Sequence, residues 1–487
     1  MSRKITALTL CIAFLTTAMG RVAADSSTIG SGLKPCSVGR SKTPARCGVF
    51  RVRENRSFGS GRTIALRIVL LLARHSSGRA VAFIAGGPGQ SAVALAPAIA
   101  DGAFARELDA LRDRFDILLV DNRGMGGSNA FGCDFTPATD PGSYFAELWP
   151  DKYVSACRAR IGQTGDPNFY NTNNAVADLD EVRAALGYRK LVLDGSSYGT
   201  LFAFVFLRRN PEHVESAVLD GVYAPHFQPV PGAPAAAQIA LNDLASRCVR
   251  DITCRSHFPS FLEHFRAIVA RFDRGPISMT LRRKGATPRR VLLSKEVFVD
   301  DIRQMLDEPG NAAYLPATIE AAWSGNYDPL AQLIEAVAQG LSHGLDWAAF
   351  LSYTCADEIP FVSETRVRRE AARSFAKDLR VRAQQRACSR WNIHAMPQSF
   401  NEPVWSDTPV LMIGGSDDPA TPPRYSTAEL PYLPKARQVI IAGAGHATET
   451  ACTDRLKVDF IRDSGRSTAT RLGCSEKYVP PRFSSTP

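Results

Sequence analysis

After its first 24 residues the sequence contains no apolar run long enough to cross a membrane, which excludes a protein built from spanning helices. It also contains no internal repeat and no low-complexity tract, so a repeat architecture is excluded. The net charge is +10, but the basic clusters at 282–284 and 366–386 are not interleaved with aromatic residues. We therefore expect a solvated basic face and no nucleic-acid partner.

The cysteines show no Cys-x-x-Cys spacing and no neighbouring histidines of the kind that bind zinc, and we expect neither a metal site nor an organic cofactor. Cys11 lies in the first 24 residues, and the other ten of the eleven cysteines form five couples that are close in sequence. In an oxidising compartment these couples predict five disulfides. The couples are Cys36 with Cys47, Cys133 with Cys157, Cys248 with Cys254, Cys355 with Cys388, and Cys452 with Cys474.

Residues 1–24 have the features of a signal peptide. Arg3 and Lys4 give a positive start, residues 5–18 are mostly apolar, and residues 22–24 are small enough for cleavage before Asp25. We expect an exported protein without stable membrane insertion after cleavage. The sequence leaves open whether it stays in the periplasm or is extracellular, and it leaves the oligomeric state open.

Short apolar segments alternate with glycine turns and helical patterns in the first part of the chain. The segments predicted as strands are 64–70, 80–84, 115–120, 191–193 and 216–220, and then 409–413 and 438–441. This order predicts an α/β fold with a mostly parallel sheet and helices on both faces.

Helical periodicity dominates between these two groups of strands, interrupted by a hairpin at 277–281 and 291–293. We expect a core made of residues 25–222 and 406–487, divided by a mainly helical cap at 223–405. A proline-rich linker, Pro225 to Pro234, is predicted to begin the cap.

The segment Gly195-Ser196-Ser197-Tyr198-Gly199-Thr200 lies between a predicted strand and a predicted helix. It has the form Gly-x-Ser-x-Gly, in which a serine sits on a turn so tight that its neighbours must nearly lack side chains. The pattern alone is weak, but the order of strand, turn, helix and strand is the one that an α/β-hydrolase fold requires. We therefore predict Ser197 as a nucleophile.

A serine nucleophile needs a histidine base and a carboxylate that orients it, in the chain order Ser, acid, His. Of the eight histidines, only His446 lies in a glycine-rich turn after a late strand. The acid should end the strand before it, where Asp417 and Asp418 are neighbours. We prefer Asp418, because Pro419 fixes the turn after it and Asp417 can form the turn itself.

The oxyanion of an acyl-transfer intermediate needs prearranged donors. One should be the backbone N–H of Tyr198, which follows the nucleophile. The other is predicted to come from the turn Gly86-Gly87-Pro88-Gly89, where we choose Gly87. Since no Lys-Ser or Lys-Thr follows this turn, it is not a phosphate-binding loop.

These motifs, with Asp121-x-Arg123-Gly124-x-Gly126-x-Ser128, Asp418-Pro419-x-Thr421-Pro422 and Gly445-His446, together resemble the prolyl iminopeptidase and tripeptidyl aminopeptidase group of α/β-hydrolases. The resemblance implies Ser197, Asp418 and His446 as the triad and removal of residues from peptide N-termini. It also implies that acidic cap residues, here Asp357 and Glu358, bind the free amine of the substrate.

The chain departs from many members of this group at Ala85, where they carry histidine, and in the order of its acidic pair. Three functions remain open at this point. The first is an exported serine aminopeptidase that acts on peptides, the second an esterase of small esters or lipids on the same triad, and the third a non-catalytic binding protein.

Overall fold

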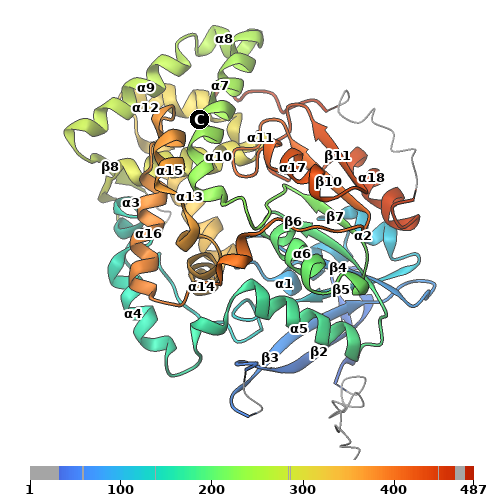
Figure 1. Ribbon diagram of the computed structural model, residues 1–487. Coiled ribbons are helices and arrows are strands. Elements are labelled where there is room, and N and C mark those ends of the chain that lie inside the picture. Colours follow the sequence, from blue (N-terminus) through green and yellow to red (C-terminus); the bar gives the residue numbers. More distant parts are fainter. Residues whose placement is uncertain are drawn as a thin grey trace, which may run out of the picture.

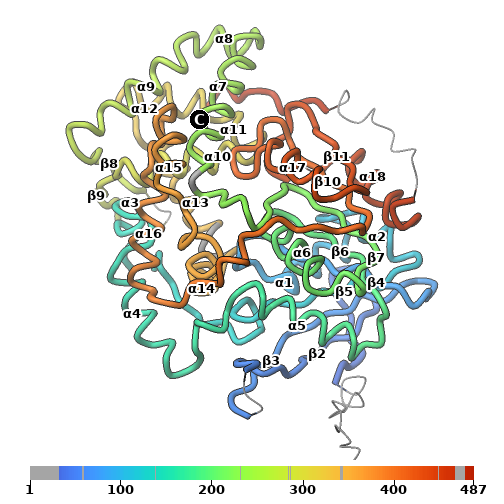
Figure 2. The backbone as a smooth tube through the Cα atoms, in the orientation of Figure 1, coloured from blue at the N-terminus to red at the C-terminus, as the bar shows by residue number. Residues whose placement is uncertain are grey.

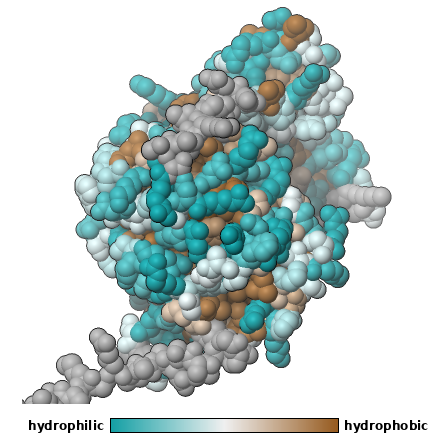
Figure 3. Space-filling model, turned by 90° about the vertical axis from the view of Figure 1, so that its right-hand side faces the viewer, coloured by the Kyte–Doolittle hydropathy of each residue, from teal (hydrophilic) through white to brown (hydrophobic). Residues whose placement is uncertain are grey.

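The computed structural model describes residues 32–57, 60–137, 139–282, 285, 287–447, 449–466 and 478–487. The predicted signal peptide, 1–24, and Cys474 lie outside the described residues. Among the helices in these ranges, none has the length and apolarity needed to cross a membrane. The face seen in Figure 3 is mostly hydrophilic, with separate hydrophobic patches between the polar side chains.

A nine-stranded sheet forms the centre of the molecule (Figure 1). Its order is β1-β2-β3-β5-β4-β6-β7-β10-β11, in which neighbouring strands from β1 to β5 pair antiparallel and those from β5 to β11 pair parallel. The strands are β1 Lys34–Val38, β2 Thr43–Arg53, β3 Thr63–Leu71, β4 Arg79–Ile84, β5 Phe115–Val120, β6 Leu191–Ser196, β7 Val214–Asp220, β10 Val410–Gly415 and β11 Ala436–Ile441. The predicted α/β fold with a mostly parallel sheet is confirmed.

Helices cover both faces of this sheet, as the buried runs of its central strands require. On one face lie α5 Thr172–Ala185 and α6 Tyr198–Arg209, whose apolar residues join the larger core cluster. On the other face lie α1 Ala92–Ala100, α2 Arg106–Leu111 and α18 Ala451–Arg462. Outside these layers are α3 Pro141–Ala146, α4 Asp151–Ile161 and α17 Arg424–Glu429.

Between β7 and β10 the chain leaves the sheet and forms a mainly helical segment, which we call the helical insert (Figure 2). Its helices are α7 Pro229–Arg250, α8 Ile252–His257, α9 Phe261–Arg271, α10 Lys295–Asp307, α11 Pro309–Ala312, α12 Leu315–Trp323, α13 Asp328–Gly344, α14 Trp347–Asp357, α15 Glu364–Ala372 and α16 Leu379–Trp391. The predicted hairpin is present as β8 Ile277–Leu281 and β9 Arg289–Leu293. The exact division into core and cap, at 223 and 405, stays a prediction.

The predicted proline-rich linker is wrong in its second half, because Pro229 begins helix α7 and Pro234 lies inside it. The first four N–H groups of a helix have no partner within the helix, so prolines in the first turn remove no hydrogen bond. The Pro234 carbonyl accepts a hydrogen bond from the Ser374 hydroxyl at 2.6 Å, which ties this helix to the turn after α15.

Four disulfides are formed as predicted: Cys36–Cys47, Cys133–Cys157, Cys248–Cys254 and Cys355–Cys388. The fifth predicted couple, Cys452 with Cys474, includes a residue outside the described ranges. Disulfides persist in oxidising compartments, so these four fit an exported protein.

Candidate active site

Ser197 sits at the turn between β6 and α6 in a backbone conformation of φ 55° and ψ −119°, which is rare for a residue with a side chain. The turn is closed by two glycines. A Cβ on Gly195 would lie 2.4 Å from the Gly199 carbonyl oxygen, and one on Gly199 would lie 2.2 Å from the Ile84 oxygen. The Ser197 N–H donates to the Asp220 carbonyl at 2.9 Å. These contacts fix the serine at the carboxyl end of the sheet.

His446 follows β11, and its Nδ1 lies 2.9 Å from Asp418 Oδ2, after β10. Asp418 is 2% exposed. Its Oδ1 accepts the N–H groups of Ala420 and Thr421, and its Oδ2 also accepts the Thr421 hydroxyl at 2.7 Å. Asp417 makes no such contact with the imidazole; its Oδ1 instead accepts the Ser416 hydroxyl. The structure therefore brings Asp418, and not Asp417, to the histidine.

The charges around His446 favour its protonated form. Burial alone would lower its pKa, but the attraction of Asp418 and the hydrogen bond to it, together with the charges of Asp307 and Asp220, raise the pKa of His446 to about 9. In turn, burial acts to raise the pKa of Asp418, and His446 and the Thr421 hydrogen bonds outweigh burial and lower it. The two shifts together favour the ionised pair, aspartate with imidazolium, over the neutral pair.

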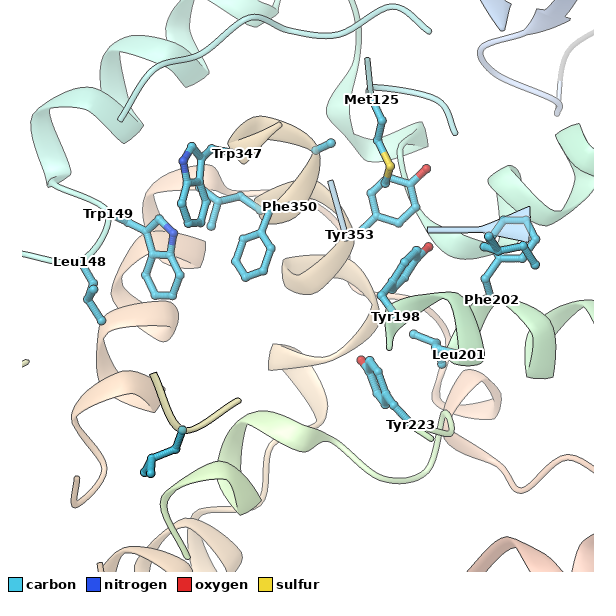
Figure 4. Close-up of a cluster of buried hydrophobic side chains, with 14 of the residues drawn as sticks. Met125, Leu148, Trp149, Tyr198, Leu201, Phe202, Tyr223, Trp347, Phe350 and Tyr353 are labelled. Carbon is cyan, nitrogen blue, oxygen red and sulfur yellow. The ribbon is translucent and has the colours of Figure 1, made fainter. Parts of the chain in front are cut away.

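Ser197 and His446 line one cavity of about 460 Å³ at the junction of the sheet and the helical insert. The Ser197 hydroxyl makes no hydrogen bond within the described residues. Aromatic residues from separate segments form part of the wall, and Figure 4 shows Trp149, Trp347 and Phe350 grouped on one side, with Tyr223 on the other. Trp149 and Phe350 stack with their ring centroids 5.7 Å apart. The cavity can hold a substrate of mixed polar and apolar character.

The glycine turn after β4 lies against the serine. A Cβ on Gly86 would meet the Ser197 Cβ at 3.2 Å, and both Gly86 and Gly87 line the cavity. The N–H groups of Gly87 and Tyr198 donate to no other group among the residues that the structure describes. Asp121 fixes the segment that follows this turn. Its carboxyl group accepts the Ser91 hydroxyl at 2.6 Å and the Gly127 N–H at 2.9 Å.

The two acidic residues predicted to bind an amine have different positions. Asp357 is absent from the cavity wall; its Oδ2 accepts both the N–H and the hydroxyl of Thr172, and the Thr172 hydroxyl lies 2.7 Å from the Tyr198 hydroxyl. Glu358 lines the cavity, is 3% exposed, and accepts the Val230 N–H at 2.9 Å. Burial raises the pKa of each to about 7.

The helical insert also contacts the histidine turn through residues that sequence reasoning did not find. The Asp307 carbonyl, at the end of α10, accepts the His446 N–H at 2.7 Å. Its side chain is paired with Arg303, which also pairs with Asp300. All three line the cavity. No group of three or more His, Cys, Asp or Glu residues within the described ranges is arranged to hold a metal ion.

Comparison with known proteins gives the class first. Residues 79–247 match the alpha/beta hydrolase fold family, and residues 374–471 match the family described as TAP-like protein. Its fold and its relatives together show that the chain is a serine hydrolase. It is an α/β-hydrolase of the TAP-like group, as the sequence motifs predict.

Its relatives include peptidases and an esterase. Serine protease Hip1 of Mycobacterium tuberculosis is 26% identical over 413 residues, which cover 78% of this chain and 77% of that protein. Tripeptidyl aminopeptidase of Streptomyces lividans is 29% identical over 199 residues, 37% of this chain and 36% of that protein. Carboxylesterase B of M. tuberculosis is 29% identical over 233 residues, 43% of each chain.

Among solved structures, a thermophilic esterase from Thermogutta terrifontis is similar at 14% identity and a TM-score of 0.38, covering 85% of this chain and 99% of that chain. A proline iminopeptidase of Mycobacterium smegmatis is similar at 13% identity and a TM-score of 0.36, covering 86% and 99%.

Proposed function

We propose that the protein is an exported aminopeptidase that releases residues or short peptides from peptide N-termini through an acyl-enzyme. Ser197 attacks the scissile carbonyl, His446 takes the proton of the hydroxyl and passes it to the leaving amine, and Asp418 holds the imidazole in the required tautomer. Water, activated by the same histidine, then releases the acyl group. The hydrogen bond between His446 and Asp418, beside a serine on the same cavity wall, supports these roles.

The N–H groups of Gly87 and Tyr198 serve as the oxyanion hole. Prearranged amides at this position stabilise the charge that develops on the carbonyl oxygen, and removal of one such donor in other enzymes slows turnover about 100-fold or more. The tight packing of Gly86 on Ser197 supports the assignment, because it places the glycine turn beside the attacking atom.

The observation that carries the peptidase proposal is Glu358, a buried carboxyl group on the wall that also holds Ser197 and His446. It forms no ion pair with a described residue, so it can accept the ammonium of a peptide N-terminus. We assign amine binding to Glu358 alone. Asp357 supports Tyr198 through Thr172, which is a positioning role.

An esterase is the second candidate, favoured by the apolar side of the cavity formed by Trp149, Trp347 and Phe350. The relative named carboxylesterase B fits this alternative. An uncharged acyl group would bind there without need of a carboxylate partner.

The test is a panel of aminoacyl and tripeptidyl anilides with free or acetylated N-termini, beside simple esters. We expect hydrolysis of the free-amine anilides, a large loss when the amine is acetylated, and a loss of at least about 10⁴-fold in Ser197→Ala with folding unchanged. Indifference to acetylation together with a preference for uncharged esters would establish the esterase instead. Retained activity in Ser197→Ala would remove the serine mechanism altogether.

We further propose that the mature protein functions in the periplasm or outside the cell. Fractionation of cells that produce the full chain tests this proposal, and recovery of uncleaved protein in the cytoplasm would contradict it.

A further inference from the structure

The cavity has a part that the proposed mechanism does not use. Four charged side chains from four different elements line it on the face of the sheet covered by α2 and α18, and we call this part the charged arm. Its members are Glu107 of α2, Asp194 of β6, Asp220 of β7 and Lys457 of α18. Each of them is at most 5% exposed.

The single cation of the charged arm already has partners. Lys457 Nζ lies 3.1 Å from Asp220 Oδ2 and 3.3 Å from Glu107 Oε1. Asp194 forms no hydrogen bond and no ion pair within the described residues, and its Oδ2 is fully buried, as is the second oxygen of Glu107. Unpaired carboxyl oxygens in a buried place are rare because an unmade hydrogen bond there is costly. The charged arm therefore has more hydrogen-bond acceptors than the described residues around it have donors to pair with them.

Asp194 is close to the nucleophile in the sequence, and aromatic rings line the cavity near it. Asp194 lies three residues before Ser197, and Ser196 between them also lines the cavity. Phe83 is paired with Asp194 in the register of β4 and β6, and its ring packs edge-on against Phe104, with both rings on the cavity wall. An apolar stem that ends in a positive charge suits such a passage, because the stem packs on the rings and the charge reaches the carboxyl group.

The surroundings of Asp194 disfavour its charged form when no cation is bound to it. Burial, opposed by Lys457, raises the pKa of Asp194 to about 8. A cation placed against the carboxyl group would favour its ionised form. Lysine and arginine both offer several donors on a flexible stem.

We propose that the charged arm is a specificity pocket for a basic side chain, and that Asp194 binds the ammonium or guanidinium of a lysine or arginine whose carbonyl is attacked by Ser197. This inference rests on the proposed function, since it names the residue preferred at the cleaved bond. Phe83 and Phe104 hold the stem of that side chain, and Glu107 adds negative charge beside Asp194.

The test uses two tripeptidyl diphenyl phosphonates that differ only in the last residue, lysine or norleucine, and measures their rates of covalent labelling of the whole protein. Norleucine has the lysine stem without its charge. We expect the lysine probe to react at least about tenfold faster than the norleucine probe with the wild type, and this preference to fall to within about twofold in Asp194→Asn. Equal rates in the wild type, or a preference that survives Asp194→Asn, would overturn the assignment.

A small fluorophosphonate, run in parallel, separates this inference from the proposed function. Labelling by it and equal labelling by both peptidyl probes would remove only the basic pocket. No labelling by any of the three would remove the serine hydrolase mechanism, and the pocket with it.

A measurement on the wild type alone covers the case in which Asp194→Asn does not fold. n-Butylamine, protonated at neutral pH, should slow labelling by the lysine probe, whereas 1-butanol at the same concentration should not. Equal protection by the two compounds would contradict a cation-binding pocket.

Discussion

The turns at the strand ends and the helical insert meet at one cavity, but they contribute by different physical means. The turns after β6, β10 and β11 present side chains with defined chemistry, Ser197, Asp418 and His446, on backbone that is tightly constrained. The insert contributes Glu358 to the wall of the cavity. It also contributes the main-chain carbonyl of Asp307, which accepts the His446 N–H. The first region carries the proposed catalytic groups and most of the charge that acts on His446, whereas the second supplies part of the cavity wall and one further charge, Asp307, near the histidine.

We expect the largest effect on stability at the serine turn, from the substitution Gly199→Ala. The new methyl group would lie 2.2 Å from the Ile84 oxygen and 3.3 Å from the Ala85 oxygen, and these main-chain atoms cannot move aside as a flexible side chain could. We expect destabilisation by more than about 4 kcal/mol or failure to fold. Urea denaturation measures the effect.

The control for that substitution is Gly162→Ala, at the end of α4. Gly162 has a helical φ of −53°, and a Cβ there would meet nothing within 4 Å. We expect its free energy of unfolding to change by less than about 0.5 kcal/mol. A similarly small change in Gly199→Ala would show that the turn tolerates a side chain.

The next largest effect lies in the helical insert, at the disulfide that joins α14 to α16. Cys355 and Cys388 are 33 residues apart, and replacing both by serine releases a long loop next to Glu358. We expect a loss of about 2–4 kcal/mol in the free energy of unfolding. Replacement of Cys36 and Cys47, 11 residues apart in the antiparallel part of the sheet, is the matched control and should cost less. An equal or larger loss in that control would mean that native contacts rather than loop length set the effect.

The different positions of Asp357 and Glu358 predict different kinetics. Glu358→Gln keeps the size of the side chain and should raise KM for free-amine anilides about tenfold, with little change for acetylated esters, because only the ammonium loses its partner. Asp357→Asn keeps the acceptor for Thr172 and should leave that KM within about twofold. Steady-state kinetics on both substrate types checks this. A larger KM effect in Asp357→Asn than in Glu358→Gln would reverse the assignment.

The positions of the strand-end groups in the fold could be predicted because each depends on a residue type that the backbone or the chemistry demands. Glycines at 195 and 199 are required by contacts under 2.5 Å, so the serine between them is recognisable once the pattern is seen between a predicted strand and a predicted helix. The pairing of Asp418 rather than Asp417 was also predictable from the proline that follows it. The helices on both faces of the sheet followed from the apolar runs of its strands.

The contribution of the insert could not be predicted in the same way. Asp307 contacts His446 through a carbonyl that every residue carries, so no residue type marks the position. The same holds for Asp194 in the core, inside β6, because its surroundings depend on α2 and α18, whose packing no local pattern encodes. Pro229 and Pro231 misled because proline is common both in linkers and in the first turn of a helix, whereas Pro234 lies beyond that turn, inside the helix.

The smallest effect is also the most direct measure of the contact between the two regions. Asp307→Asn retains the carbonyl that binds the His446 N–H and removes one negative charge that raises the pKa of His446. Since catalysis needs the neutral imidazole, kcat/KM should rise with pH through that pKa, which is about 9 in the wild type. Without the charge at 307 the imidazolium is less stable, so the rising limb should move to lower pH, by less than about one unit.

The pH profile is best measured with a neutral ester, so that no substrate group titrates in the same range. Asp101→Asn is a suitable control, because Asp101 is bound by Arg40 and Ser41 at the end of α1 and does not line the cavity. The rising limb of the pH profile of Asp101→Asn should coincide with that of the wild type. No shift, or a shift of the Asp307→Asn limb to higher pH, would mean that the carboxylate at 307 does not raise the pKa of His446.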